Sequence, residues 1–187
     1  MKKFGLPALL FVIAAVSGAY AQQFPDKING YKVYSANIVV TTADRSTAST
    51  EKVDATVTIG KLKLGMPGLL SVGVEAGGEF TSISQEGKVD FLQFRDMQVN
   101  GIAIDVQDFK TPFEIKKGRL TPLPANIRGN IGLTGVAKAA YKELTESKDI
   151  WNVTGTVLVF GRFKKYGFEF KRVVPIKVDL TMSNPLR

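Results

Sequence analysis

The sequence predicts an all-β protein, a β-sandwich with one short inserted α-helix, and three observations support this. Apolar and polar residues alternate with a period of two along most of residues 31–182, which is the pattern of strands with one buried face. Glycine and proline interrupt the alternation at short intervals, as turns between neighbouring strands require. Only residues 134–147 place apolar side chains at helical spacing.

The first 21 residues are expected to be a cleaved secretory signal peptide. Lys2 and Lys3 precede an apolar run, and a stretch of small residues ends at Ala21, which suits cleavage there. The apolar run is shorter than the roughly 20 residues that span a bilayer. An uncleaved N-terminal anchor is the alternative. The expected mature protein is one domain, residues 22–187, that is periplasmic or secreted and has no transmembrane segment after cleavage.

The composition excludes several ways of stabilising or anchoring an exported protein. The chain has no cysteine and no histidine, so disulfides, a lipid-bearing cysteine and the usual structural zinc sites are all excluded. The formal charge is +8. Without the two leader lysines, 23 Lys and Arg face 17 Asp and Glu, which leaves +6. Because acidic residues are interspersed with the basic ones, this charge indicates a solvated, mixed surface.

The first half of the mature chain reads as strands separated by polar or glycine-rich turns. Strands are expected within 31–41, within 53–64 and within 70–76, with turns at 65–68 and 82–88. The pair Gly77-Gly78 predicts a bulge or bend. The Ser/Thr-rich stretch 43–50 is expected to be a mobile hairpin tip.

The clearest turn in the chain is Asn100-Gly101. Both residues tolerate the positive φ angles of a two-residue hairpin, so two paired strands are expected around it. Beyond them, apolar Phe109, Phe113 and Ile115 form a short element that ends at Lys117-Gly118. Pro122 and Pro124 then frame a loop or an edge strand.

Two long strands follow the expected helix. Odd-numbered residues from Trp151 to Phe163 form one face of the first strand, although Leu158 and Phe160 interrupt the polar opposite face. The second runs from Phe168 to Met182 after a glycine turn. Arg172 shares the parity of its apolar residues, so either a bulge near Pro175 shifts the register or Arg172 lies at the sheet margin. The helix is expected to pack on the sheet, with a membrane-surface helix as the alternative.

Six to eight strands with short turns favour an immunoglobulin/fibronectin-like antiparallel β-sandwich, with an open barrel as the second choice. From about residue 90 onward, the order of elements resembles the late embryogenesis abundant type 2 family. The resemblance rests on the Val99-Asn100-Gly101-Ile102 hairpin, Leu123-Pro124-Ala125, the helix near residue 140, and Trp151-Asn152-Val153-Thr154-Gly155. It implies a folded β-sandwich with one helix that is associated with desiccation and other stresses. The earlier half lacks the Asn-Pro that follows an early strand in that family, and Met66-Pro67 is the nearest substitute.

The chemistry available to this chain is limited. Without histidine and cysteine, neither a Ser-His-Asp triad nor a thiolate nucleophile can form, and no phosphate-binding glycine motif occurs. We therefore expect no enzyme activity, cofactor or metal site. Glu75 with Glu79, or Asp105 with Asp108, could in principle pair as acid and base or bind calcium, but ordinary surface acids are favoured. A Ser-Lys dyad stays open at this stage.

The remaining candidate site is a surface. Aromatic residues lie among cations near the last turn, and the candidate contact residues are Arg162, Lys164, Lys165, Tyr166, Lys171 and Arg172. Such a mixture can bind single-stranded nucleic acid, but export argues against that partner. A client protein or an anionic membrane surface is expected instead, and inward phenylalanines with outward lysines on a strand are the plain alternative.

Two functions are consistent with these observations. The first is a non-enzymatic, stress-associated stabilising module of the cell envelope. The second is a periplasmic lipid or apolar-ligand-binding protein, in which a gap between sheets is lined by Phe91, Phe94, Phe109 and Phe113. A carrier requires a cavity of several hundred Å³, whereas a stabilising module requires none.

Overall fold

In the computed structural model, the described residues are 24–43, 53–68, 70–132, 142 and 149–184. They form an all-β fold, as the sequence predicts. Three expectations lie outside the described residues: the signal peptide, the hairpin tip at 43–50 apart from its first residue, and all but one residue of the helix at 134–147.

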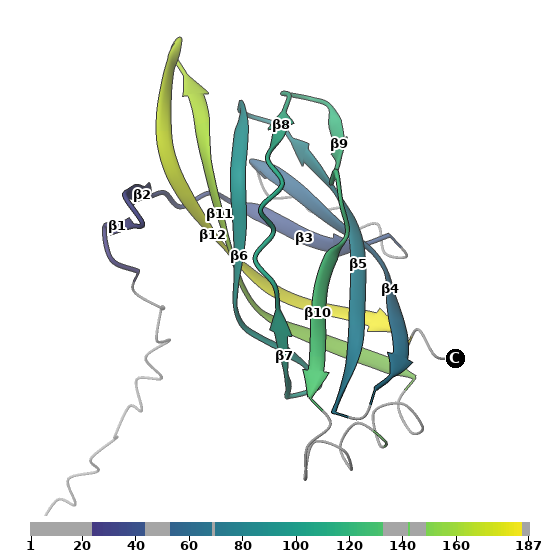
Figure 1. The fold of residues 1–187 in the computed structure, drawn as a ribbon. Coiled ribbons are helices and arrows are strands. Elements are labelled where there is room, and N and C mark those ends of the chain that lie inside the picture. Colours follow the sequence, from purple (N-terminus) through teal and green to yellow (C-terminus); the bar gives the residue numbers. More distant parts are fainter. Residues whose placement is uncertain (1–23, 44–52, 69, 133–141, 143–148, 185–187) are drawn as a thin grey trace, which may run out of the picture.

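Twelve strands form one mixed sheet (Figure 1). Its order is β1-β2-β12-β11-β6-β7-β10-β5-β4-β3, with β8 paired to β6 and β9 to β5. The strands are β1 (Lys27–Ile28), β2 (Tyr31–Val33), β3 (Ile38–Thr42), β4 (Ala55–Pro67), β5 (Ser71–Ser82), β6 (Glu86–Val99), β7 (Ile102–Val106), β8 (Phe113–Ile115), β9 (Leu120–Pro122), β10 (Ile127–Gly132), β11 (Ile150–Lys165) and β12 (Phe168–Ser183).

The expected antiparallel sheet is wrong in two places, because β2 pairs with β12 in parallel and β3 pairs with β4 in parallel. Both parallel pairs come from the segment that was expected to hold one strand within 31–41. That segment is split into β2 and β3. Residues between them leave β12, where the Tyr34 amide donates to the Val173 carbonyl, and reach β4, where the Asn37 amide donates to Asp54.

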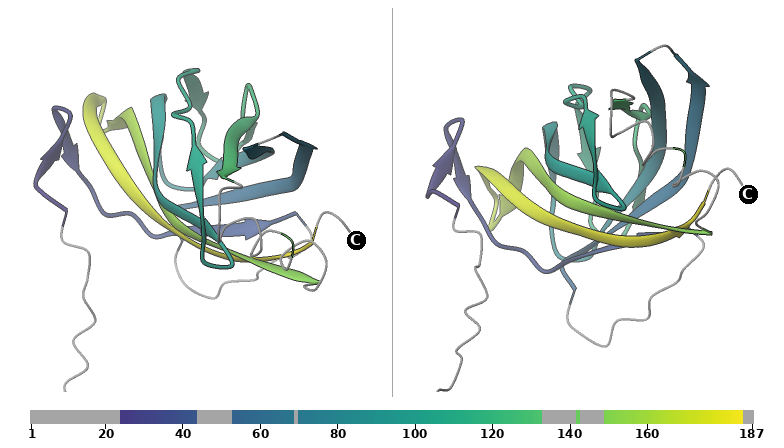
Figure 2. Two further views of the ribbon diagram at one scale, coloured as in Figure 1. Left: turned by 60° about the horizontal axis from the view of Figure 1, so that its bottom comes forward. Right: turned by 90° about the horizontal axis from the view of Figure 1, so that it is seen from below.

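The sheet is strongly bent, so that its two arms face each other (Figure 2), and the main apolar core lies between them. One arm contains β12, β11 and β6, and the other contains β10, β5, β4 and β3. The main core cluster joins them: Leu92, Val159 and Ile176 of the first arm are packed against side chains such as Val57 and Phe80 of the second. The structure therefore confirms the all-β part of the β-sandwich prediction. The interior lies between two arms of one mixed sheet.

Local turn signals placed several strands correctly. Asn100 and Gly101 have φ values of 48° and 81°, and they connect β6 to β7 as expected for a two-residue hairpin. A bulge or bend is expected at Gly77-Gly78 of β5. The irregularity is instead on β4, the strand paired with these glycines, where the register shifts between Ile59 and Leu62. The turn expected at 65–68 begins later, because β4 continues to Pro67.

The apolar residues that interrupt the polar face of β11 belong to a second, smaller core. Leu158 and Phe160 are fully buried on the side of the sheet away from the main cluster. The short ribbon β1–β2 covers them, with Tyr31 edge-on to Phe160 at a centroid distance of 5.2 Å. The N-terminal ribbon thus acts as a lid on the outer face of β11.

Arg172 is on the apolar face of β12, as its parity predicts. No bulge occurs near Pro175, because the β11–β12 register is continuous over the whole hairpin. The guanidinium is instead placed beyond the main core, 5.4 Å from the ring centroids of both Tyr34 and Phe170. Stacking on two aromatic faces compensates for the partial loss of water around this cation.

Candidate apolar binding site

Three hollows lie in a row between the two arms of the sheet. The first has a cavity volume of about 100 Å³. Its walls are aliphatic, aromatic and methionine side chains, with one glycine and no charged residue, contributed by β4, β5, β6, β7, β10, β11 and β12. Pockets that hold drug-sized ligands measure about 300–1,000 Å³, so a ligand of that size would have to move the two arms of the sheet apart.

The second hollow adjoins the first. It has a cavity volume of about 60 Å³, and Glu79 is the single charged residue in its wall. Five residues line both hollows, which places the two spaces next to each other: Ile59, Phe94, Ile127, Val157 and Val178. All five are apolar, so no polar side chain lies among the residues that the two hollows share.

A third hollow, with a cavity volume of about 40 Å³, continues the row. It shares Phe80 and Val159 with the second hollow. Its rim is polar, since Asp54, Ser84 and Gln85 belong to it. The Asp54 carboxylate accepts hydrogen bonds from the Asn37 amide at 3.0 Å and the Ser84 hydroxyl at 3.2 Å, which ties three chain segments together at this end.

The apolar side chains that line the three hollows are less buried than those of a filled core. Ile59, Phe94, Ile127 and Val157 alternate with outward residues on their strands and face inward, yet each is only partly buried. Interiors of proteins are normally packed to the density of organic crystals. Inward-facing apolar side chains that remain partly exposed therefore mark space that an apolar partner can fill.

The four phenylalanines expected to line a gap are divided by the structure. Phe94 and Phe113 line the second hollow. Phe109 is buried in the main core and is not part of a hollow wall. Phe91 is on the opposite face, stacked on Phe160 with a centroid distance of 4.3 Å, so its expected position is wrong.

The predicted surface residues all lie on the β11–β12 hairpin, but they are not one cluster. Arg162 and Lys164 form ion pairs with β6, Arg162 to Asp90 at 2.9 Å and Lys164 to Glu86 at 3.3 Å. The other cations lie near aromatic rings: Lys165 above Tyr166 at 5.5 Å and Lys171 above Tyr31 at 5.9 Å. Arg172 is on the inner face, as described above.

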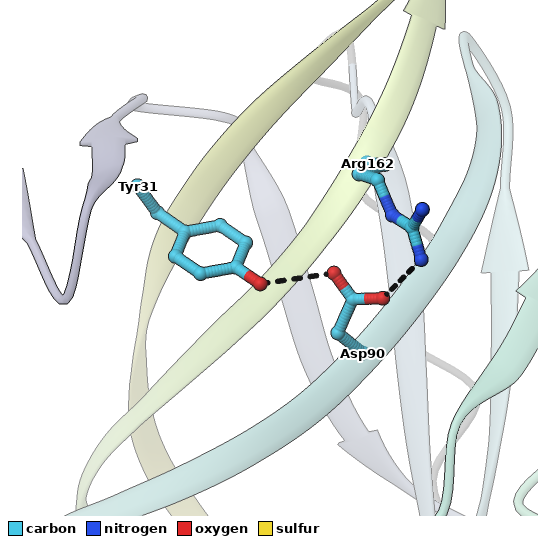
Figure 3. Close-up of polar contacts among 3 residues, drawn as sticks. All are labelled: Tyr31, Asp90 and Arg162. Atoms are coloured by element: carbon cyan, nitrogen blue, oxygen red, sulfur yellow. Dashed lines mark hydrogen bonds and ion pairs between the residues drawn. The ribbon is translucent and has the colours of Figure 1, made fainter.

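Tyr31, Asp90 and Arg162 form a polar clasp on the outer face (Figure 3). The Tyr31 hydroxyl donates to one carboxylate oxygen of Asp90 at 3.1 Å, and the Arg162 guanidinium donates to the other at 2.9 Å. Burial, and then the hydrogen bond to Asp90, raise the pKa of Tyr31. The same carboxylate raises the pKa of Arg162. The clasp connects β2, β6 and β11 and so holds the N-terminal ribbon in place.

Two of the acidic residues considered from the sequence, Glu75 and Asp108, bind other side chains. Glu75 and Glu79 are four residues apart on β5, about 13 Å along a strand, which exceeds the spacing of a glycosidase pair. Glu75 instead binds Arg128 at 3.0 Å, and Asp108 accepts a hydrogen bond from Gln93 at 3.4 Å. Within the described ranges, no three acidic residues come close enough together to hold a metal ion.

The N-terminal ribbon was missed in the sequence, although two signals pointed to it. Asn29-Gly30 is the same hairpin signal as Asn100-Gly101, with φ values of 51° and 79°, and it forms the turn of the N-terminal ribbon. Leu158 and Phe160 on an otherwise polar face were the second signal for this ribbon. Over the part of the chain that the structure describes, no helix has the length and apolar character needed to cross a membrane.

Comparisons with known proteins add little. No family model matches the chain, and no curated protein matches it. One solved structure is similar, a crystal structure of a protein from Archaeoglobus fulgidus, with 10% sequence identity and a TM-score of 0.36. The similarity covers 67% of this chain and 94% of that one.

Proposed function

We propose that this protein is a non-enzymatic carrier of an apolar ligand of the size of an acyl chain, and that it acts after export, in the periplasm or outside the cell. The observation that supports the proposal is the row of three adjoining hollows, of about 100, 60 and 40 Å³, with partly exposed apolar walls. A ligand that covers these walls is stabilised by about 25 cal/mol for each Å² of apolar surface removed from water.

The polar rim of the third hollow would orient such a ligand. The first two hollows contain one charged wall residue between them, Glu79, whereas the third has Asp54, Ser84 and Gln85 at its margin. A molecule with an apolar tail and a polar head would place its tail in the first two hollows and its head at this margin. Apolar pockets with a few polar groups at one end commonly orient ligands in this way.

The proposal also concerns the architecture. We propose that the two arms of the sheet function as the facing layers of an immunoglobulin/fibronectin-like sandwich, and that the hollows are the gap between these layers. The resemblance to the late embryogenesis abundant type 2 family stays a prediction, as do export and the absence of enzyme activity.

A stress-associated stabilising module remains the second candidate. The exposed hairpin aromatics are the feature that favours it, because a stabiliser acts through apolar contact with unfolded clients. Its test is suppression of the aggregation of a heated or dried model enzyme. Suppression with no bound apolar ligand would favour this function over the carrier.

The carrier is tested with the mature protein and the fluorescent probe N-phenyl-1-naphthylamine. We expect probe fluorescence to rise on binding and to fall when dodecanoate is added. Val157→Phe places a larger side chain where the first two hollows meet and should weaken probe binding about fivefold or more, because an overfilled site costs about 1 kcal/mol or more.

Val39→Phe is the matched control. Val39 alternates on β3 with Ile38 and Val40, which pack against the main core, so Val39 faces outward. This variant should bind the probe like the unmodified protein. Denaturing mass spectrometry of the purified protein should also show recurrent co-purified lipid. Absence of both probe binding and co-purified lipid would refute the carrier.

A further inference from the structure

The β11–β12 hairpin extends past the rest of the sheet (Figure 1). The pairing of β11 with β6 ends at Lys164 opposite Glu86, and β2 pairs with β12 only at Arg172 and Val173. From Lys165 to Lys171, the two strands therefore have only each other as neighbours in the sheet. Such a free tip is available for contact with a partner.

One face of the tip is aromatic and exposed. Phe168 and Phe170 alternate on β12 with outward residues and continue the inner face of the sheet beyond the core. Phe168 is 70% exposed, Phe170 39% and Tyr166, in the turn, 88%. Large apolar side chains gathered at an exposed position usually mark a contact surface.

The same face leads directly into the row of hollows. Phe170 is the cross-strand partner of Phe163, and Phe163 lines the third hollow. On that face of β12, Arg172 lies between Phe170 and Val174, so the apolar connection from the hollow to the tip runs through Phe163 of β11 and Phe170. An apolar molecule that leaves the hollow would meet these rings first.

The tip is strongly cationic. Residues 162–172 contain one acidic residue, Glu169, and five basic ones, Arg162, Lys164, Lys165, Lys171 and Arg172. Asp90 and Glu86 of β6 pair with Arg162 and Lys164. Among the described residues, the other three have no carboxylate at ion-pair distance. Their charge remains available to an external anion.

A second basic turn lies at the same end of the molecule. Ile115 at the end of β8 pairs with Gly87 at the start of β6, next to the residue that faces Lys164. The turn after Ile115 is exposed and carries Lys116, Lys117 and Arg119, and Leu120 follows it with 58% of its surface exposed. This end of the molecule therefore combines two cationic turns with exposed apolar side chains around the third hollow.

We propose that this end docks on an anionic lipid bilayer, with Tyr166, Phe168 and Phe170 inserted at the headgroup level and the lysines on lipid phosphates. The proposal rests on the carrier function and names the membrane as the place of loading or release. Aromatic residues favour the membrane interface, and basic residues near an anionic surface are attracted to it. A hairpin tip is small compared with the roughly 800 Å² that a stable protein interface buries on each partner.

The first experiment measures co-sedimentation of the mature protein with vesicles. We expect binding to vesicles of phosphatidylcholine and phosphatidylglycerol at 7:3, weaker binding as salt is added, and little binding to phosphatidylcholine alone. Lys165→Gln with Lys171→Gln should weaken binding about 25-fold, or about fivefold for each cation removed. Phe168→Ser with Phe170→Ser should also weaken it.

Matched controls carry the same changes elsewhere. Lys61→Gln with Lys63→Gln removes two exposed lysines from β4. Met66→Ser with Leu70→Ser removes two exposed apolar side chains, 95% and 65% exposed, from the end of β4 and the turn that follows it. Both controls should bind like the unmodified protein. Equal losses in controls and hairpin variants, or no preference for anionic vesicles, would overturn the docking proposal.

The second experiment reports insertion directly. Phe168→Trp should show a blue shift of its fluorescence on anionic vesicles, while Met66→Trp should show none. Trp151 is fully buried and contributes the same background to both. Probe binding without vesicles should be unchanged in the hairpin variants. If vesicle docking fails while probe binding persists, only docking is refuted, and loss of probe binding with docking intact refutes only the carrier.

Discussion

Asp90 is the residue on which the outer face of the sheet depends. Its carboxylate accepts hydrogen bonds from Tyr31 and Arg162 at once, so three strands distant in sequence meet at one side chain. Charge-assisted hydrogen bonds of this kind are stronger than neutral ones. Because Arg162 is partly exposed, solvent screens part of its attraction to Asp90.

The clasp makes a prediction about pH. Burial and the Asp90 hydrogen bond raise the pKa of Tyr31 above its ordinary value of 10.0. The folded state therefore holds this proton more tightly than the unfolded state. The resulting stabilisation is fully present below pH 10 and is lost as the pH rises through the pKa of the folded protein. Chemical unfolding at a series of alkaline pH values checks this sign.

Asp90→Asn should lower the pKa of Tyr31 toward its ordinary value, because the charge of the carboxylate is lost while burial remains. The measurement is the absorbance of tyrosinate at 295 nm, with the spectrum of Tyr31→Phe subtracted to isolate this residue. Glu114→Gln, an exposed neutralisation on β8, is the control and should leave the titration unchanged. An unaltered titration in Asp90→Asn would contradict the role assigned to the clasp.

At Phe160, a second prediction concerns the lid formed by the N-terminal ribbon. The ring is fully buried between Phe91 and Tyr31. Phe160→Ala should destabilise the protein by about 3–5 kcal/mol, since a large aromatic side chain is removed from a filled site. Urea unfolding measures the loss. Phe168→Ala, which truncates an exposed ring, should change stability little, and similar losses in both would refute the assignment of a second core.

At the level of secondary-structure elements, the pairing of β11 with β6 contains a bulge that requires glycine. The register of the pair shifts between Thr154 and Thr156, and the intervening Gly155 has a φ of 150°. A side chain there would meet Met97 and the Arg95 carbonyl. Gly155→Ala should therefore cost about 1–3 kcal/mol.

Gly73→Ala provides the comparison for that substitution. Gly73 is within β5, has no positive φ, and nothing lies within 4 Å of the position that its Cβ would take. Alanine restricts the unfolded chain, so this variant should be unchanged or up to about 1 kcal/mol more stable. Thermal unfolding of the two variants side by side gives the measurement. Equal behaviour would mean that the bulge does not depend on glycine.

The elements also show how far the sequence can be interpreted. Alternation placed β11 and β12, and Asn100-Gly101 placed the turn between β6 and β7, because these signals are local. The parallel pairs β2–β12 and β3–β4 join segments whose pairing no local signal encodes. Parity alone could have shown that Leu158 needed a cover, but not that residues 27–33 supply it.

The candidate site was predictable only in part, and for a related reason. Phe94 and Phe113 were expected in a gap, and both line a hollow, since strand parity determines which way they face. Whether inward residues meet across the interior or leave space depends on the distance between the arms of the sheet. That distance is a property of the whole sheet and its bend, which a pattern of alternation does not specify.

For the whole molecule, the hollows predict a link between ligand and stability. A ligand that binds only the folded protein stabilises it by about 2.7 kcal/mol at a free concentration 100 times its dissociation constant. Dodecanoate should therefore raise the unfolding temperature of the unmodified protein and of Val39→Phe, but much less that of Val157→Phe. Differential scanning calorimetry measures the shift, and an equal shift in all three would place the ligand elsewhere.

The position of β12 in the sheet determines when the protein can complete its fold. This last of the described strands does not close an edge but lies inside the sheet, between β2 and β11, and contributes Val174 and Ile176 to the main core. A nascent chain emerging from its N-terminus consequently lacks one wall of its interior until residue 183 is made. Completion of the fold therefore requires residues 168–183, and fragments that stop before residue 168 should stay open to proteases.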